Sequence, residues 1–194
     1  MLRTAFFTLL TLLIAIGGGA GSVWYALGTV GGLGALTVGG WTAYPQAGGG
    51  NADPYSKARI AREAELPLGR AEGLAFIAER DSANAPLRRN CTYRVEGNIP
   101  QSRFWTLYAA GPGNRALPAV GDRARGASAF EVVRQPDNSV LISISRHPAP
   151  LNWLAISGDG PMTLVLTLYD TPVTSNENIG EIELPQVLRV GCDG

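Results

Sequence analysis

Apart from Arg3, the first 28 residues are apolar or weakly polar, and Arg3 is the one charged side chain in the first fifty positions. The run over residues 5–27 is long enough to cross about 30 Å of hydrocarbon as a helix. Trp24 and Tyr25 lie near the end of this run, where aromatic side chains meet a membrane interface. We therefore predict a transmembrane signal-anchor helix in residues 1–28, with the lipid bilayer as the partner of residues 5–27.

A cleaved secretory signal peptide is the alternative for this segment, with residues 1–4 as its charged region and residues 5–16 as its apolar core. The anchor is favoured because the apolar run continues to Leu27. Arg3 on the short flank, with no Lys or Arg on the other flank until Lys57, favours a cytoplasmic amino terminus. The rest of the chain is then expected in the periplasm, attached to the bacterial inner membrane by a single span.

Glycine is concentrated in the first part of the chain, where 13 of the 25 glycines precede Asp53. Residues 29–52 are predicted as a glycine-rich juxtamembrane segment, with a helical extension at the membrane surface followed by a loop. Gly17-x-x-x-Gly21 and Gly28-x-x-x-Gly32 have the spacing that lets helix backbones pack closely, which predicts helix-mediated self-association. Glycines in a tolerant apolar segment explain the spacing equally well.

Residues 53–194 are predicted as a separate domain, because hydrophobic and polar positions alternate beyond Leu68 with the period of half-buried strands. A short amphipathic helix, Pro54–Glu65, precedes them. Six or seven strands without long helices between them predict a mainly β fold, an antiparallel β-sandwich. The clearest runs are Cys91–Gly97, Phe104–Ala109, Val140–Ser145 and Met162–Tyr169, and weaker ones are Gly73–Glu79, Ser128–Val133 and Gln186–Val190.

Charge and composition exclude several classes of function. Sixteen basic and sixteen acidic residues leave no positive excess for binding nucleic acid. The chain has a single histidine, His147, and two cysteines, which rules out a zinc cluster rich in His and Cys. The composition does not exclude a metal site made of carboxylates. The glycine motifs of nucleotide-binding loops are absent from the sequence. We therefore expect neither a cofactor nor a nucleic-acid partner, and we predict no metal ligands.

Cys91 and Cys192 are the two cysteines of the chain. In an oxidising compartment the simplest pairing joins them, closing a loop of about 100 residues and stabilising the fold by roughly 4–5 kcal/mol. Such a bridge would keep the last strand from fraying. Two buried thiols are the alternative, and a redox-active pair is disfavoured because no Cys-x-x-Cys motif occurs.

Residues 40–192 carry six short motifs in order: Gly40-Trp41, Ala52-Asp-Pro-Tyr-Ser-Lys-Ala-Arg59, Cys91-Thr-Tyr-Arg-Val-Glu-Gly97, Arg103-Phe-Trp105, Asn152-Trp-Leu154 and Thr167-Leu-Tyr-Asp170. In these motifs the sequence resembles the bacterial family called domain of unknown function 1214. The resemblance implies a jelly-roll-like β-sandwich with no established activity, substrate or catalytic residue. In the short versions of that family a single amino-terminal membrane helix replaces a second uncharacterised domain. Many relatives have proline at the position of Ala155, so the resemblance does not predict the conformation of the turn at this position.

Aromatic and polar side chains on a β-sandwich can line a ligand groove, with Arg and Asn supplying directional hydrogen bonds. Trp153 is the leading candidate because Pro148–Leu154 is predicted as a loop, where a tryptophan needs a reason to be held. A simpler explanation of these residues is that the aromatic side chains fill the core and the arginine faces solvent. The full set of candidate ligand-binding residues is Trp105, Tyr108, Arg146, Asn152, Trp153 and Tyr169.

The favoured function is a non-catalytic binding or structural module of the cell envelope, with an envelope protein, a glycan or a small ligand as its partner. The alternative is a hydrolase or carbohydrate-active enzyme whose carboxylates are brought together only by the fold. Catalysis predicts two carboxylates, or His147 with a partner, in one cleft with shifted pKa values. Glu181 and Glu183 lie two positions apart, which would place both on one strand face, and a solvated edge strand explains them equally well. Binding predicts a groove lined by Trp105 or Trp153 without convergent acids.

Overall fold

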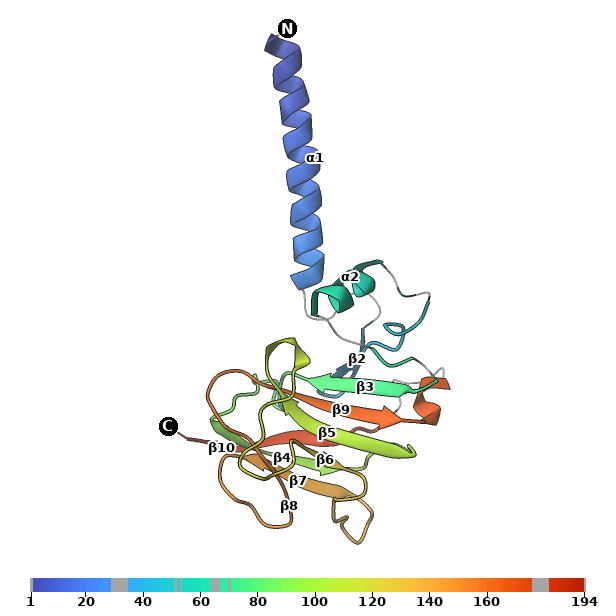
Figure 1. Ribbon diagram of the computed structural model, residues 1–194, viewed down its shortest axis with the longest axis vertical. Helices are drawn as coiled ribbons and strands as arrows, with labels where there is room; N and C mark the ends of the chain where they lie inside the picture. Colours follow the sequence, from blue (N-terminus) through green and yellow to red (C-terminus); the bar gives the residue numbers. More distant parts are fainter. Residues whose placement is uncertain are drawn as a thin grey trace.

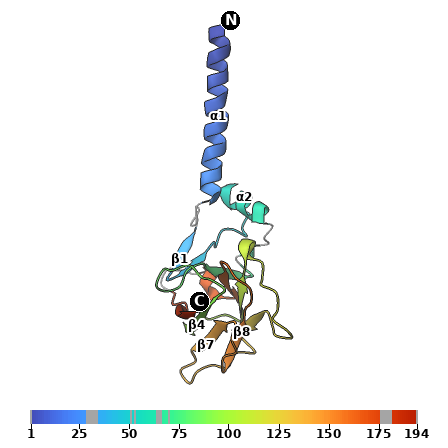
Figure 2. The same ribbon diagram turned by 90° about the vertical axis from the view of Figure 1, so that its left-hand side faces the viewer.

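A long helix and a β domain make up the part of the protein that the computed structural model describes, residues 2–28, 35–50, 52, 54–63, 67–69, 71–175 and 182–193. Helix α1 (Leu2–Gly28) projects from the β domain, and the short helix α2 (Pro54–Glu63) lies between them (Figures 1 and 2). The 3-10 turns η1 (Pro112–Asn114) and η2 (Pro172–Ser175) follow strands of the domain. The predicted short helix is therefore present, and it begins at Pro54 as expected.

The strands of the described chain form two sheets, with the orders β1-β2-β3-β9-β5-β6 and β10-β4-β7-β8. Neighbouring strands are antiparallel except β7 and β8, whose parallel pairing departs from the antiparallel expectation. A mainly β fold with two sheets and one amino-terminal apolar helix is thereby confirmed, while the jelly-roll connectivity stays a prediction. The strand bounds are β1 Leu36–Val38, β2 Trp41–Ala43, β3 Gly73–Ala78, β4 Cys91–Gly97, β5 Phe104–Ala110, β6 Gly126–Ser128, β7 Val140–Ser145, β8 Asn152–Ala155, β9 Thr163–Tyr169 and β10 Gln186–Cys192.

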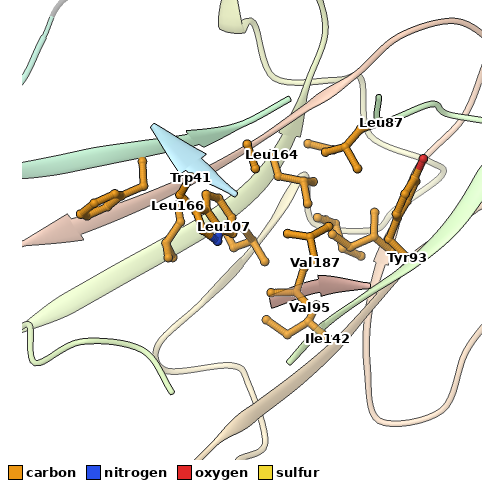
Figure 3. Close-up of a cluster of buried hydrophobic side chains, with 14 of the residues drawn as sticks. Trp41, Leu87, Tyr93, Val95, Leu107, Ile142, Leu164, Leu166 and Val187 are labelled. Carbon is orange, nitrogen blue, oxygen red and sulfur yellow. The ribbon is translucent and has the colours of Figure 1, made fainter. Parts of the chain in front are cut away.

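The core lies between the two sheets, where alternate side chains of facing strands meet. Leu164 and Leu166 of β9 enter it from the six-stranded sheet, and Val95, Ile142 and Val187 enter it from the four-stranded sheet (Figure 3). Each of these side chains is at most 3% exposed, and burial of one large aliphatic side chain stabilises a fold by about 1.5–3 kcal/mol. The period-two pattern of the sequence therefore marks the inward faces of the long strands correctly.

The β domain begins earlier in the chain than the predicted boundary at Asp53. Residues 36–43 form the hairpin β1–β2, which pairs with β3 and completes the six-stranded sheet. Gly39 has φ +59 in the turn, a conformation that favours glycine, and Trp41 is only 1% exposed. Strand β6 likewise ends at Ser128, so residues 129–133 of the predicted strand are not a strand. The segment between Gly28 and Ala52, predicted as a helical extension followed by a loop, therefore contains a β-hairpin at residues 36–43, and its residues 29–34 lie outside the described residues.

A disulfide joins Cys91 at the start of β4 to Cys192 at the end of β10, as predicted. The two residues are register partners on adjacent antiparallel strands. The free edge of β10 is covered from the other side, since the backbone N–H of Ser82 donates to the Val187 carbonyl and the Val187 N–H donates to the Ser82 hydroxyl. The last strand is thus held on both sides, which limits the exposed edge available for unwanted strand pairing.

The apolar side chains of helix α1 are exposed and do not pack against the β domain. Residues Leu2–Tyr25 are long and apolar enough to cross a membrane, and none of this span is buried against the rest of the protein. Phe6, Leu13 and Ile16 are each more than half exposed. An amino-terminal signal sequence would show the same length and composition. The structure therefore confirms one apolar helix of spanning length and leaves its membrane topology to a proposal.

Candidate binding cleft

Trp105, one of the predicted ligand-binding residues, belongs to the core. It points inward from β5 and is 2% exposed. Its indole Nε1 has no hydrogen-bond partner among the described residues. Trp105 therefore fills space between the sheets and does not line an open groove.

Asn152 has an architectural role at the start of β8. Its amide nitrogen donates to the carbonyl oxygens of Val133 and Leu141, each at 2.8–2.9 Å, and its Oδ1 accepts the Val133 N–H at 2.8 Å. The side chain is 8% exposed. These three bonds join β8 to the start of β7 and to the segment before it, so the amide is fully used inside the protein.

Trp153 lies on β8. The predicted loop over Pro148–Leu154 is therefore wrong for its last three residues, which belong to this strand. Its side chain faces away from the core, its Nε1 donates to the Ser145 carbonyl at 3.1 Å, and the Arg123 guanidinium stands 4.3 Å above the ring. Arg146 follows directly after β7 and pairs with Asp159 at 2.7 Å. Trp153 and Arg146 therefore lie near each other in the chain's β7–β8 region, each with partners of its own.

Tyr108 and Tyr169 lie on the outer face of the other sheet. Their strands β5 and β9 alternate, with Leu107 and Leu168 in the core and the tyrosines on the opposite face. Tyr169 contacts the ring of Phe104, its register partner, at a centroid distance of 5.8 Å. The six predicted residues are therefore divided among the core, the β7–β8 region and the outer face of the six-stranded sheet, and they do not share one groove.

A cavity of about 1710 Å³ lies instead beside the hairpin β1–β2, and we call it the cleft. Its lining takes residues from the hairpin, the loop between β3 and β4, the end of β4, η1, the turn that leads into β7, the starts of β9 and β10, and Ile60 of α2. This volume exceeds the roughly 300–1,000 Å³ of pockets that hold small molecules. Apolar side chains in the lining include Trp41, Ile77, Leu141, Met162, Leu184 and Val187, and its charged ones are Glu79, Arg80, Asp81, Glu96, Asp137 and Glu183.

The walls of the cleft are fixed by specific bonds. Trp41 Nε1 donates to the Pro185 carbonyl at 2.7 Å and so joins the hairpin to the segment that leads into β10. Asp81 is 3% exposed, accepts the backbone N–H groups of Ala83 and Ala85, and pairs with Arg189 at 2.9 Å. These contacts hold the loop between β3 and β4 against β10.

The charge of the cleft is biased toward acid, with five carboxylates and one arginine in its lining. Asp81 and Glu96 are neutralised by Arg189 and Arg94, the latter pair at 2.7 Å. Glu79 and Glu183 are exposed and make no ion pair with any described residue. The Ser139 hydroxyl and then its backbone N–H hold the pKa of Asp137 below its ordinary value of 3.8. The accessible charge of the cleft is therefore mainly negative, whereas Trp41, Met162 and Val187 of its lining belong to the core.

Sequence reasoning missed this cleft because its hairpin strands are three residues each, too short to show alternation. Gly40-Trp41 was visible as the first motif of the family resemblance, and that was the one available signal. Glu183 lines the cleft, whereas Glu181, two positions earlier, lies outside the described residues. Among the described residues no three His, Cys, Asp or Glu side chains gather in a way that could hold a metal ion.

Comparisons with known proteins identify a family and a shared fold. Residues 72–173 match the sequence model of a family described as "Protein of unknown function (DUF1214)". The VPA0106 protein from Vibrio parahaemolyticus has a similar structure, with a TM-score of 0.57 and 18% identity over 73% of this chain and 36% of its own. An uncharacterized protein from Burkholderia cenocepacia gives a TM-score of 0.41 at 18% identity over 75% of this chain and 46% of its own. No curated protein matches the chain. This chain thus spans about a third of the Vibrio protein, and the likeness shows the fold alone.

Proposed function

The chain belongs to the DUF1214 family of proteins of unknown function, and from this premise we propose that it is a membrane-anchored binding module of the bacterial cell envelope. In this proposal α1 crosses the inner membrane once and the β domain lies in the periplasm. The domain holds a ligand in the cleft and performs no chemistry on it.

The exposed apolar surface of α1 carries the anchoring part of the proposal. A helix of this kind in water would expose far more contiguous apolar surface than soluble proteins tolerate, and a bilayer removes that surface from water. Arg3 on its short flank favours the cytoplasm for the amino terminus. The Cys91–Cys192 bridge supports export of the β domain, because disulfides persist in oxidising compartments such as the periplasm.

The cleft favours binding over hydrolysis. A catalytic acid needs a raised pKa, whereas the bonds from Ser139 lower the pKa of Asp137 in the lining. Two further carboxylates, Asp81 and Glu96, are engaged by arginines. His147 does contact a carboxylate, Asp193, at 3.2 Å, but its side chain is 71% exposed and it is not part of the cleft lining. A cavity that combines apolar and polar lining groups can bind a ligand without acting on it.

Reporter fusions after Gly194 test the anchored, exported arrangement. We expect an alkaline phosphatase fusion to be active and a green fluorescent protein fusion at the same position to be dark, because only the first reporter matures in the periplasm. Alkaline extraction should leave the chain in the membrane pellet. An inactive phosphatase fusion together with a fluorescent green fluorescent protein fusion would indicate the opposite topology. Release of the chain into the supernatant would argue against the anchor.

A further inference from the structure

Three aromatic side chains form a row on the outer face of the six-stranded sheet, where strands β9, β5 and β6 are neighbours (Figure 1). Phe104 of β5 and Tyr169 of β9 are register partners and alternate with core residues, so both rings point away from the core. Their ring centroids are 5.8 Å apart, and the Phe130 ring lies 5.3 Å from that of Phe104. None of these residues lines the cleft. The aromatic row is therefore a surface feature separate from the cleft.

Phe130 is held in place although it is exposed. Its side chain is 86% exposed, more than any other large apolar side chain of the described β domain. The turn that carries it follows β6 directly, and the Ala129 N–H donates to the Trp105 carbonyl at 3.0 Å. The Ser128 carbonyl accepts the Glu131 N–H, and the Ser128 hydroxyl donates to Glu131 Oε2 at 2.9 Å. A phenyl ring on such a fixed turn loses little freedom when a ligand packs against it.

Polar side chains flank the aromatic row. Arg103 and Asp170 adjoin it in sequence, and the Arg103 Nε lies 3.4 Å from Asp170 Oδ2. Their side chains are 82% and 67% exposed, so both keep most of their hydrogen-bonding capacity for solvent or a ligand. Thr106 and Ser128 are register partners in the next row of the same sheet and add hydroxyl groups. This surface therefore combines aromatic rings with donors and acceptors, and its charged pair has no net charge.

These features favour an uncharged ligand that carries many hydroxyl groups. The ring hydrogens on one face of a sugar form an apolar surface that packs against aromatic rings, and sugar hydroxyls both donate and accept hydrogen bonds. An anionic membrane or a nucleic acid would need a positive excess, which the Arg103–Asp170 pair does not supply. A stable protein interface buries roughly 800 Å² on each partner, and Phe130 is the one strongly exposed apolar side chain of the aromatic row.

We propose that this outer face of the β domain binds a neutral saccharide chain. Its sugar rings pack against Phe130 and Phe104. Its hydroxyl groups bond to Arg103 and Asp170. Because the aromatic row is outside the cleft lining, this site goes beyond the proposed function and does not depend on what the cleft binds. A linear chain of β-linked sugars is the best fit, since it presents the same ring face repeatedly along its length.

Saturation-transfer NMR of the full chain, in a detergent without a sugar headgroup, tests this site with cellohexaose and chitohexaose. We expect saturation to pass from the aromatic rings mainly to the ring hydrogens of the sugars, because these hydrogens contact the phenyl faces. Titration calorimetry then measures the dissociation constant, which Phe130→Ala should raise about tenfold. The exposure of Phe130 predicts that this variant keeps the melting temperature of the parent protein.

Two further variants separate the saccharide site from the rest of the surface. Arg103→Gln should raise the dissociation constant about fivefold, because a charged donor to the sugar hydroxyls is lost. Val190→Ala is the matched control, since Val190 is exposed on β10 of the other sheet and should leave saccharide binding unchanged.

Absence of binding by both hexasaccharides, or equal affinity in the parent protein and Phe130→Ala, would overturn the proposal. Light scattering covers a protein partner: a smaller oligomer in Phe130→Ala, without saccharide binding by the parent, would identify the aromatic row as an interface between copies of the chain and also overturn it. These results are independent of the reporter fusions, because a reversed topology would refute the proposed function and leave saccharide binding by the purified chain unaffected.

Discussion

Trp41 and Pro185, 144 positions apart in the chain, are joined by a hydrogen bond of 2.7 Å from the indole Nε1 to the backbone carbonyl. This bond connects the first hairpin of the β domain to the segment that begins its last strand. It also closes one wall of the cleft, because both residues belong to the lining. The same indole therefore belongs to the core of the β domain and helps to hold two segments of the cleft lining together.

Replacing Trp41 should destabilise the β domain in two steps. Trp41→Phe keeps an aromatic ring but removes the hydrogen bond, which should lower the free energy of unfolding by about 1–3 kcal/mol. Trp41→Ala also removes the ring and should cost about 3–5 kcal/mol. Denaturant unfolding of the detergent-solubilised protein measures both values. Trp24→Phe, at a position on α1 that is 78% exposed, is the control and should leave the stability unchanged. A stable Trp41→Phe variant would contradict the importance of the bond.

Loss of the disulfide should lower the melting temperature under oxidising conditions. Cys192→Ser is the better variant because Cys192 is exposed, whereas Cys91 is 3% exposed and a serine there would also alter the core. The chain-entropy estimate for a bridge of this sequence separation is about 4–5 kcal/mol. Thermal unfolding with and without dithiothreitol measures the effect. The reductant should destabilise the parent protein and leave Cys192→Ser unaffected; equal melting temperatures for all samples would argue that the bridge contributes nothing.

Asn152 and Trp153 should respond differently to substitution although they are neighbours. Asn152→Ala removes three hydrogen bonds from a buried position, and we expect a loss of about 2–4 kcal/mol in unfolding free energy. Trp153→Phe keeps a ring under Arg123 and removes one bond to Ser145, so we expect a loss near 1 kcal/mol. Urea titrations compare the two variants. A larger effect at Trp153 than at Asn152 would contradict this ranking.

The mature amino terminus should retain the apolar helix. Intact-mass analysis of the membrane fraction is expected to find a chain that begins at Met1 or Leu2, because the apolar run continues past the length of a signal-peptide core. A start near residues 20–30 would instead make this a secreted protein. That result would remove the anchor while leaving the fold of the β domain intact.

Asp137 should titrate below its ordinary pKa of 3.8, because the Ser139 hydroxyl and backbone N–H stabilise its charged form. A carboxyl whose pKa is lower in the folded state stabilises the fold above its unfolded pKa, and this contribution disappears as the pH falls through the folded pKa. Carbon-detected NMR titration measures the value directly. Ser139→Ala should move the pKa of Asp137 upward, and an unchanged titration would show that the hydroxyl is unimportant.

The long strands could be predicted from sequence because each buries one face. Strands β4, β5, β7 and β9 have six or seven residues, enough for alternation to stand out from chance. The hairpin β1–β2 could not be found this way, since three residues show no period. Its position in the sheet depends on pairing with β3, more than 30 positions later in the chain. The parallel pair β7–β8 was not visible either, because the bonds of Asn152 to Leu141 of β7 and to Val133 join segments 11 and 19 positions away.

The candidate site was harder to predict than the fold. Periodicity distinguishes the two faces of a strand but does not show which residues of different strands share a cavity. Trp105 was correctly placed on a strand and is nevertheless core. Trp41 was passed over because it follows a glycine-rich stretch, where composition suggested a linker. The cleft is assembled from segments separated by up to 150 positions, so only the folded chain reveals it.

The early start of the β domain limits how far it can travel. Gly28 ends α1 and Leu36 begins the first strand, so eight peptide steps separate them and even a fully stretched chain spans at most about 28 Å. That reach is roughly the diameter of one small domain. If α1 spans the membrane as proposed, the β domain stays within this distance of the bilayer surface. A partner attached to the outer membrane or the peptidoglycan would then have to extend to the domain.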